Sequence, residues 1–221
     1  MTTAVYPKEA TGAAYALDLM NYAQARTWEA VDAIAAVIRP GMTEKEATLL
    51  GRQILLDLNM ERIWHPLLVR FGVNTLKGFN QRSEGDPVLA DNDIFFIDMG
   101  IVWKGHEGDA GATFTVGNDP EMIACAAAAK TLYQRVEAHW RESACTGVEL
   151  YDFAQQQAEA MGWKLNLDIK GHRVSDFPHA IYRAGDLGDY DGQPNKGLWI
   201  LEIQIAHPSK AYGAFYEDLL V

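Results

Sequence analysis

Two aspartates stand beside apolar runs in a way that could bring their carboxylates together. Asp98 directly follows the apolar run 94–97, and Asp109 lies eleven residues later, shortly before the run 113–116. If the two runs form adjacent strands joined by a turn, both carboxylates reach the same region. The pair alone is weak evidence, because 30 of the 221 residues are acidic. Taken alone, it is more simply explained as a strand-end cap and a turn aspartate.

Two glutamates interrupt apolar segments near the end of the chain. Glu202 lies within the run 198–203, and Glu217 lies among Phe215, Tyr216 and Leu219. Burying an ionised carboxylate without a partner costs several kcal/mol or forces it to take up a proton. Both glutamates therefore imply a nearby cation, either a metal ion or a salt-bridge partner. The alternative is that each lies on an edge strand with its charged face in water.

Two histidines extend this set of donors. His172 and His179 are seven residues apart, and Pro178 between them argues against one continuous helix, so we expect them on a loop or on neighbouring strands. One such histidine is more often structural, but four carboxylates with an imidazole suit Mn, Fe(II), Co or Zn. Two divalent ions would offset four carboxylates. Ions about 3.5–4 Å apart can share a hydroxide and polarise a carbonyl.

The hydrophobic periodicity predicts the elements that must position these side chains. A period near 3.6 predicts a helix over 11–39, and Thr43 with Glu46 has the form of a capping box that opens a second helix, to about residue 58. Further patterns predict strands at 67–69, 94–97 and 113–116, helices at 120–143 and 147–160, and closing strands at 198–206 and 214–221. This order predicts an α+β fold with a curved, mainly antiparallel sheet flanked by helices. We expect residues 1–221 to form a single domain.

The composition limits the classes of partner. Nineteen Lys and Arg against 30 Asp and Glu give a net charge of −11, whereas a protein that binds a phosphate backbone needs positive charge on one face. We therefore expect no nucleic-acid partner. The first ten residues lack the basic start and long apolar run of a signal peptide. No apolar stretch approaches the roughly eighteen residues that span a bilayer, so we expect a cytoplasmic protein with no membrane partner.

The separate blocks resemble the methionine aminopeptidase, aminopeptidase P and creatinase superfamily, which has the pita-bread fold. The resemblance extends from residues 40–44 to Glu217 and rests on five blocks in the same order. In motif style it is closest to the aminopeptidase P (Xaa-Pro) branch. We expect no room before these blocks for the N-terminal domain of aminopeptidase P and creatinase. Any contribution of that domain to the pocket is expected to be absent or to come from a partner subunit, which favours a homodimer.

The resemblance implies five ligands for two divalent metal ions: Asp98, Asp109, His172, Glu202 and Glu217. By resemblance, Asp98 chelates one ion, and Asp109 and Glu217 bridge both. His172 and Glu202 complete the second ion's shell. All five positions carry the expected residue type.

The resemblance also implies catalytic roles and exposes one departure. Glu202 would act as acid and base, and His179 would donate a hydrogen bond to the substrate or intermediate. Peptidases of the family usually carry a histidine about seventeen residues before the first metal-binding aspartate, but residues 78–82 contain none here. His65 lies earlier, and we expect it to reach the pocket from another direction as a third catalytic residue.

Other departures fall beside the same blocks. Gly111 stands where a threonine is usual, and Ile203 stands where a proline is common. Arg173 follows the metal-binding histidine, where it would either meet a substrate carboxylate or pair with Asp176. We therefore expect an intact metal centre and a remodelled substrate pocket.

Together, these expectations predict that the protein is a dinuclear metal-dependent hydrolase that uses Mn, Fe, Co or Zn. The leading hypothesis is an aminopeptidase of the Xaa-Pro type that cleaves short peptides through a metal-bridging hydroxide. One alternative keeps the fold but acts on a small metabolite, as creatinase, ectoine hydrolase and sulfoniopropionate lyases do, and the missing upstream histidine favours it. A second alternative is a non-catalytic binding module, which the filled ligand positions disfavour.

Overall fold

A computed structural model describes residues 7–179 and 185–221. Its helices are α1 (Leu17–Ala35), α2 (Glu44–Asp57), α3 (Pro120–Glu142) and α4 (Gly147–Ala160). Its strands are β1 (Arg62–Phe71), β2 (Asp93–Trp103), β3 (His106–Val116), β4 (Lys164–Leu165), β5 (His172–Arg173), β6 (Trp199–Ala206) and β7 (Gly213–Leu219). None of the helices in these ranges is long and apolar enough to cross a membrane.

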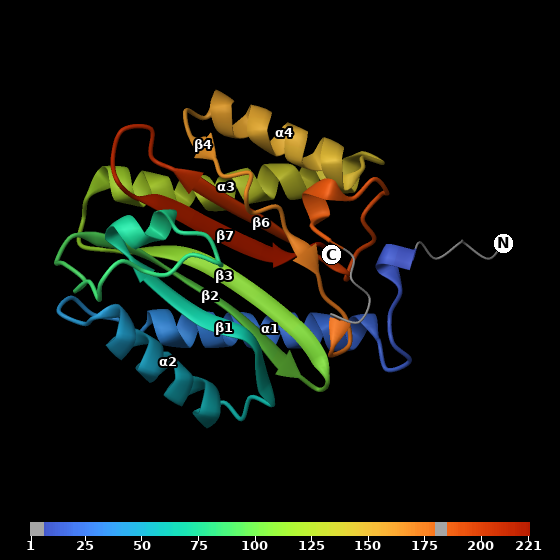
Figure 1. The fold of residues 1–221 in the computed structure, drawn as a ribbon, viewed down its shortest axis with the longest axis horizontal. Coiled ribbons are helices and arrows are strands. Elements are labelled where there is room, and N and C mark those ends of the chain that lie inside the picture. Colours follow the sequence, from blue (N-terminus) through green and yellow to red (C-terminus); the bar gives the residue numbers. More distant parts are fainter. Residues whose placement is uncertain (1–6, 180–184) are drawn as a thin grey trace.

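All seven strands belong to one sheet (Figure 1). Their order is β1-β2-β3-β7-β6-β4, and β5 pairs with β6 beside this path. Every pair of strands that the described ranges contain is antiparallel. The expected α+β fold with a mainly antiparallel sheet is therefore confirmed. The pairing of β3 with β7 joins the first half of the chain to its end, so residues from both halves meet at the middle of the sheet.

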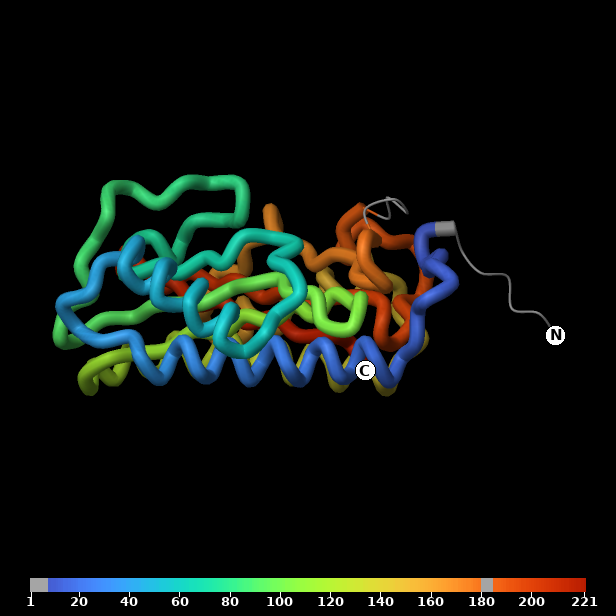
Figure 2. The backbone as a smooth tube through the Cα atoms, turned by 90° about the horizontal axis from the view of Figure 1, so that it is seen from below, coloured from blue at the N-terminus to red at the C-terminus, as the bar shows by residue number. Residues whose placement is uncertain are grey.

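The helices form a layer on one side of the sheet. Helix α1 packs on β2 and β3, and α3 packs on β6 and β7, while α2 lies against β1 and α4 against α3. Figure 2 shows α1 and α3 running along the same side, with the loop that follows β1 rising on the other. Buried apolar side chains fill the space between the helices and the strands. The opposite face of the sheet is thus left for polar side chains and loops.

Three of the four helices begin where the sequence predicts. The expected capping box at Thr43 and Glu46 is present, and Thr146 with Glu149 forms a second one that starts α4. The first helix was predicted too long, because residues 11–16 precede it in a non-helical segment. That segment is held by tertiary contacts, since the backbone N–H of Ala16 donates to Nε2 of His106 at 3.0 Å. Such contacts override a local helical period.

The strands of the first half are longer than predicted. Asp98 lies in the middle of β2 rather than at its end, and β1 begins well before the predicted run at 67–69. Glycines and polar residues interrupt the apolar pattern in these strands, so the pattern predicted only their most apolar parts. Each strand nevertheless pairs with the neighbouring strand over most of its length. The two-residue strands β4 and β5 were not predicted, because so short a strand leaves no period to detect.

Candidate metal centre

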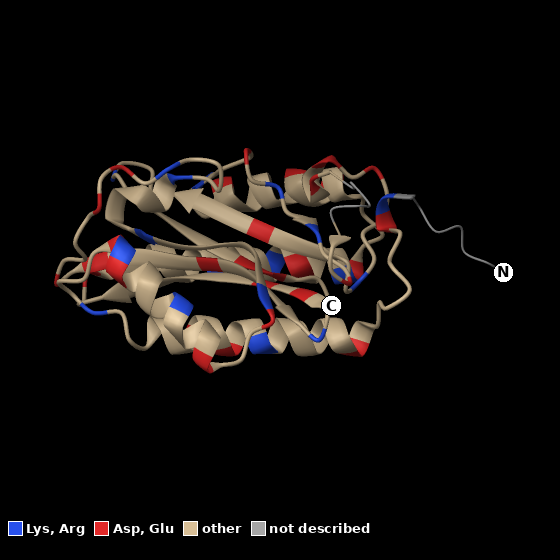
Figure 3. Cartoon of the chain, turned by 60° about the horizontal axis from the view of Figure 1, so that its bottom comes forward, with Lys and Arg blue, Asp and Glu red and all other residues tan. Residues whose placement is uncertain are grey.

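A row of paired residues crosses four strands and carries three carboxylates. Asp98 on β2 pairs with Gly111 on β3, and Gly111 pairs with Glu217 on β7. Glu217 in turn pairs with Glu202 on β6. Residues directly opposite each other in neighbouring strands have their side chains on the same face. The register of the sheet therefore places these carboxylates side by side. Figure 3, in which all acidic residues are red, shows red segments on strands of the sheet.

A second row lies two residues further along the strands, where side chains point to the same face again. Asp109 on β3 pairs with Gly100 on β2, and Gly100 pairs with His65 on β1. The pairing of β1 is irregular here, with register shifts between Ile63 and His65 and between His65 and Leu68. Bulges of this kind re-aim side chains. The irregularity brings the His65 imidazole over the sheet toward Asp109.

One glycine in each row leaves space for the neighbouring functional side chain. A Cβ at Gly100 would lie 2.2 Å from Cδ2 of His65 and 2.5 Å from Cε2 of Trp64. A Cβ at Gly111 would lie 2.8 Å from Oε1 of Glu217. Any side chain at either position would displace a ring or a carboxylate of the site. The departure from threonine at Gly111 is therefore linked to the position of Glu217.

Asp109 lies between two imidazoles at the centre of the site. Its Oδ1 is 2.7 Å from Nε2 of His65, and its Oδ2 is 2.9 Å from Nε2 of His172. Nε2 of His65 is also 3.5 Å from Oδ1 of Asp98. Gln24 on α1 fixes the backbone of Asp109, since its amide accepts from the N–H at 3.0 Å and donates to the carbonyl at 2.5 Å. The helix layer thus holds the central carboxylate in place.

The donor atoms form two groups, each compact enough to hold a metal ion. One group is His65, Asp98 and Asp109, and the other is Asp109, His172 and Glu217. Within each group the donor atoms lie within 4.8 Å of one another. Asp109 belongs to both groups. Glu202 borders the second group, because it pairs with Glu217 and its Oε2 accepts from the backbone N–H of Gly171 at 2.9 Å.

Burial and mutual repulsion raise the pKa of three of the four carboxylates at the site. Burial raises the pKa of Glu217 and Asp98 above the usual range, and it raises the pKa of Glu202 to about 7. Burial also acts to raise the pKa of Asp109, but the neighbouring His65 and His172 outweigh it and lower that pKa. Asp109 is therefore the carboxylate that stays ionised most readily.

The two imidazoles carry the compensating positive charge. Burial acts to lower the pKa of both histidines, but contact with Asp109 outweighs it and raises the pKa of His65 to about 9 and that of His172 to about 10. Oε1 of Glu217 is buried without a hydrogen-bond partner among the residues described. An unpaired buried carboxylate oxygen is costly, so this atom is suited to bind a cation. Oxygen donors with two imidazoles fit a divalent metal ion.

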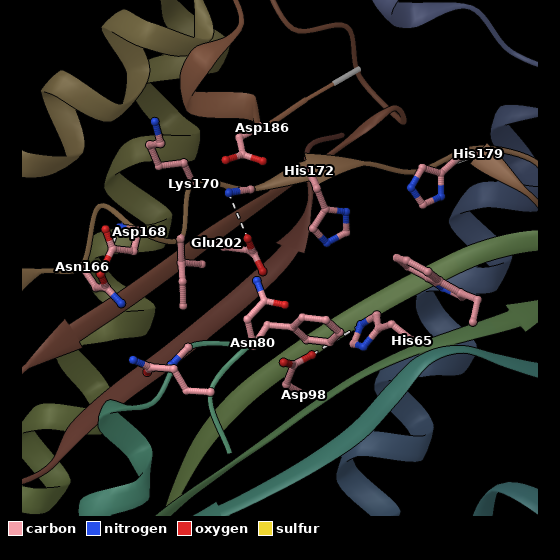
Figure 4. A pocket seen from close by; sticks show the side chains of 16 residues that line it. His65, Asn80, Asp98, Asn166, Asp168, Lys170, His172, His179, Asp186 and Glu202 are labelled. Carbon is pink, nitrogen blue, oxygen red and sulfur yellow. Dashed lines mark hydrogen bonds and ion pairs between the residues drawn. The ribbon is translucent and has the colours of Figure 1, made fainter. Parts of the chain in front are cut away.

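A cavity of about 460 Å³ opens over this face of the sheet (Figure 4). His65 and Asp98 lie on one wall, and His172 and Glu202 lie on the facing wall. Other lining side chains come from the loop after β1 and from the segments around β5: Phe79, Asn80, Gln81, Asn166, Asp168, Ile169, Lys170 and Asp186. The cavity therefore combines several of the candidate metal ligands with a lining of both polar and apolar side chains.

His179 lines the same cavity and is held by a residue that sequence reasoning missed. Its Nδ1 lies 2.5 Å from Oε2 of Glu107, and its backbone N–H donates to Oε1 of Glu107 at 2.9 Å. Glu107 is buried and also accepts from the N–H of Ser175 at 3.0 Å. The signal was available, because Glu107 lies two residues before Asp109 and shares its face of β3.

Trp64 packs among the three histidines of the cavity. Its ring meets those of His65, His172 and His179 edge to face, at centroid distances of 4.7, 5.7 and 5.1 Å. Its Nε1 donates to the carbonyl of Gly108 at 3.2 Å. A rigid aromatic ring with a fixed hydrogen bond restricts the rotation of all three imidazoles.

Arg173 occupies neither of its two predicted positions. It is buried away from the cavity, and its guanidinium donates to the carbonyls of Lys8 and Ala10, both at 3.2 Å, over the ring of Trp199. No ion pair with Asp176 occurs among the residues placed by the structure. Alternation along β5 explains the difference, because a residue next to His172 must point to the opposite face.

Comparison with protein families identifies the class of this chain. The model of metallopeptidase family M24 matches residues 18–221, and the chain belongs to this family. A methionine aminopeptidase from Clostridium acetobutylicum is 30% identical over 115 residues, which are 50% of this chain and 42% of that relative. The resemblance drawn from the sequence blocks is therefore confirmed. The chain spans less than half the length of this curated relative.

Solved structures confirm the pita-bread fold. The prolidase from Pyrococcus horikoshii matches with a TM-score of 0.76 at 19% identity, covering 96% of this chain and 60% of the prolidase. An X-Pro aminopeptidase from Thermotoga maritima matches at 0.72 and 17% identity, covering 91% of this chain and 56% of that one. A methionine aminopeptidase from Thermotoga maritima matches at 0.69 and 17% identity, covering 96% and 93%.

Proposed function

We propose that the chain is a metal-dependent hydrolase that uses two divalent ions and acts as an aminopeptidase of the Xaa-Pro type on short peptides. One observation carries the proposal: two groups of metal-binding donors share the buried Asp109, and members of both groups, His65, Asp98 and His172, line one cavity. The family supports the peptidase class. Relatives named for X-Pro and prolidase activity share the fold and support the narrower substrate class.

Each side chain of the site has a role in this proposal. Two ions bound at the shared carboxylate would activate a water for attack on a carbonyl and stabilise the developing negative charge. Glu202, whose pKa is about 7 because of burial, borders the cavity and suits proton transfer to the leaving amine. His179 engages Glu107 through Nδ1, which leaves Nε2 for a hydrogen bond with the substrate. The cavity has room for a short peptide.

A small metabolite is the second candidate substrate class. The loop that usually carries a histidine contributes Phe79, Asn80 and Gln81 to the cavity instead. His65 enters from β1, and its ring meets Phe79 edge to face at 5.6 Å. This wall differs from the pattern that the sequence resemblance implies for peptidases, so its substrate contacts must differ as well.

A substrate panel tests the proposal and separates the two classes. Protein reconstituted with manganese or cobalt is assayed against dipeptides and tripeptides with proline or alanine in the second position, and against small amides and guanidino compounds. We expect hydrolysis of the proline peptides at the first peptide bond, and loss of it in Asp109→Asn. If the protein hydrolyses only the small compounds and none of the peptides, its substrate is a small metabolite and the proposed peptidase activity is wrong.

A further inference from the structure

His65 and His172 have the same local arrangement although they lie on different strands. Nδ1 of His65 is 3.2 Å from the carbonyl oxygen of Pro66, and Nδ1 of His172 is 3.0 Å from that of Arg173. In each case the ring nitrogen contacts the carbonyl of the next residue. A backbone carbonyl can only accept, so each Nδ1 carries the proton and donates it. This leaves Nε2 as the nitrogen able to bind a metal ion.

The two Nε2 atoms face opposite oxygens of one carboxylate. Nε2 of His65 lies 2.7 Å from Oδ1 of Asp109, and Nε2 of His172 lies 2.9 Å from Oδ2. Each imidazole has a further carboxylate in its donor group, Asp98 for His65 and Glu217 for His172. The two halves of the site are therefore matched in donor type, with one nitrogen and two carboxylates each.

The backbone around His65 is shaped for this position. The register of β1 shifts on both sides of His65, and Gly100 faces the imidazole across the strands. Gly100 leaves space for the ring in this position, because a Cβ there would lie 2.2 Å from Cδ2 of His65. The backbone of β1 therefore holds the imidazole within reach of both Asp98 and Asp109.

We propose that His65 is a direct metal ligand, which binds through Nε2 the ion held by Asp98 and Asp109. The proposal rests on the proposed function, since it assumes that the site holds divalent ions. It replaces the role of His65 as a pocket residue, and it gives each ion one imidazole. Because imidazole is a softer donor than carboxylate, the added nitrogen favours cobalt, iron or zinc over manganese at this position.

The test measures metal binding directly and does not depend on activity. Metal-free protein is titrated with cobalt(II), and binding is followed by calorimetry and by the visible absorption of the bound ion. Two variants remove the ligand: His65→Ala truncates it, and His65→Phe keeps a ring against Trp64 and Phe79. His179→Ala is the matched control, because its ring lies in the same cavity but contacts Glu107 instead of the metal-binding carboxylates. Circular dichroism verifies that each variant is folded.

The expected result is loss of one tight site in both His65 variants. The native chain and His179→Ala should bind two equivalents of cobalt(II). Each His65 variant should bind one equivalent with unchanged affinity and the second at least about tenfold more weakly. Changing even a residue that only supports a ligand lowers metal affinity by about that factor. Two equivalents with unchanged affinities and absorption in a folded His65 variant would overturn the proposal but leave the proposed function intact. A native chain that binds no cobalt would overturn both.

Discussion

Asp109 is the residue on which the electrostatics of the site depend. It is fully buried, yet two imidazoles keep its pKa low, while Glu202 and Glu217 have raised pKa values. In the metal-free chain, the raised pKa values favour the protonated forms of Glu202 and Glu217. A metal ion that binds must displace these protons, because its ligands bind in their deprotonated forms.

Metal binding is accordingly predicted to release protons at neutral pH. The pKa values of His65, His172 and Glu202 are about 9, about 10 and about 7, so at pH 7 both imidazoles and part of Glu202 hold a proton that binding removes. Apparent metal affinity then rises with pH and levels off above about pH 10, where the histidines are already neutral. Calorimetry in two buffers of different ionisation enthalpy measures the release. An apparent enthalpy that is the same in both buffers would contradict it.

Glu107 is predicted to position His179 for turnover. In Glu107→Gln the carboxylate that contacts Nδ1 is replaced by a neutral amide, so the imidazole loses its fixed orientation. We expect kcat to fall about 10- to 100-fold, the loss typical when a residue that orients a metal ligand is removed, with KM and metal stoichiometry little changed. The double variant with His179→Ala should be no slower than His179→Ala alone. Additive losses would show that Glu107 acts independently of His179.

At the level of the elements, the site depends on glycines as much as on its ligands. Gly100 and Gly111 sit between ligands in the two rows, where any Cβ would meet a site side chain within 3 Å. Overpacking of this kind typically costs about 1–3 kcal/mol, because side chains leave their preferred rotamers.

Gly111→Ala is therefore predicted to weaken both stability and metal binding. Its Cβ would lie 2.6 Å from Cε1 of Phe215 and 2.8 Å from Oε1 of Glu217, so the metal-free chain should lose about 1–3 kcal/mol of unfolding free energy. Metal affinity should fall as Glu217 moves. Gly78→Ala is the control, because its nearest neighbour would be Cδ1 of Ile169 at 3.5 Å. Urea denaturation and metal titration test the pair, and equal behaviour of the two variants would contradict the steric argument.

Elements with strong local signals could be predicted from the sequence, and those shaped by tertiary contacts could not. Helices α3 and α4 and the capping box of α2 follow from periodicity and caps. The bulged first part of β1 has no alternating pattern, and β5 is too short to show one. The face on which Arg173 lies depended on β5, which explains why both of its predicted contacts are missing.

In the candidate site, too, some features could be predicted from the sequence and others depend on tertiary contacts. Asp98, Asp109, His172, Glu202 and Glu217 could be named from a family resemblance, and the structure gathers them on one face of the sheet. Which of these residues lie opposite each other depends on the register of the strands. A pattern in the sequence does not fix that register between segments that are far apart in the chain. Glu107 was missed because its partner His179 lies 72 residues away.

For the whole molecule, the metal ions are predicted to stabilise the fold that holds them. The candidate ligands come from β1, β2, β3, β5, β6 and β7, so metal binding would link both halves of the chain across the β3–β7 pairing. A ligand at about 100 times its Kd stabilises the native state by about 2.7 kcal/mol. Adding cobalt to the metal-free chain should raise its Tm, and a chelator should reverse the shift. An unchanged Tm would show that the ions do not bind the folded state tightly.

The homodimer and the cytoplasmic location stay predictions at this scale. Analytical ultracentrifugation of the purified chain tests the dimer, for which a mass near 49 kDa is expected as twice the 24.5 kDa of one chain. A single species at the mass of one chain would contradict it, and the cavity would then have to be completed by this chain alone.

The number of metal ions per chain decides whether Asp109 is shared by two binding sites. Elemental analysis of protein that has been stripped, reconstituted anaerobically with manganese, iron or cobalt, and desalted gives the number of ions per chain. Shared use of Asp109 by both donor groups predicts about two equivalents in the native chain and a loss of tight binding at both sites in Asp109→Asn. Near-zero metal in the native chain after reconstitution with each ion would contradict the account, and the fold would then serve binding rather than hydrolysis.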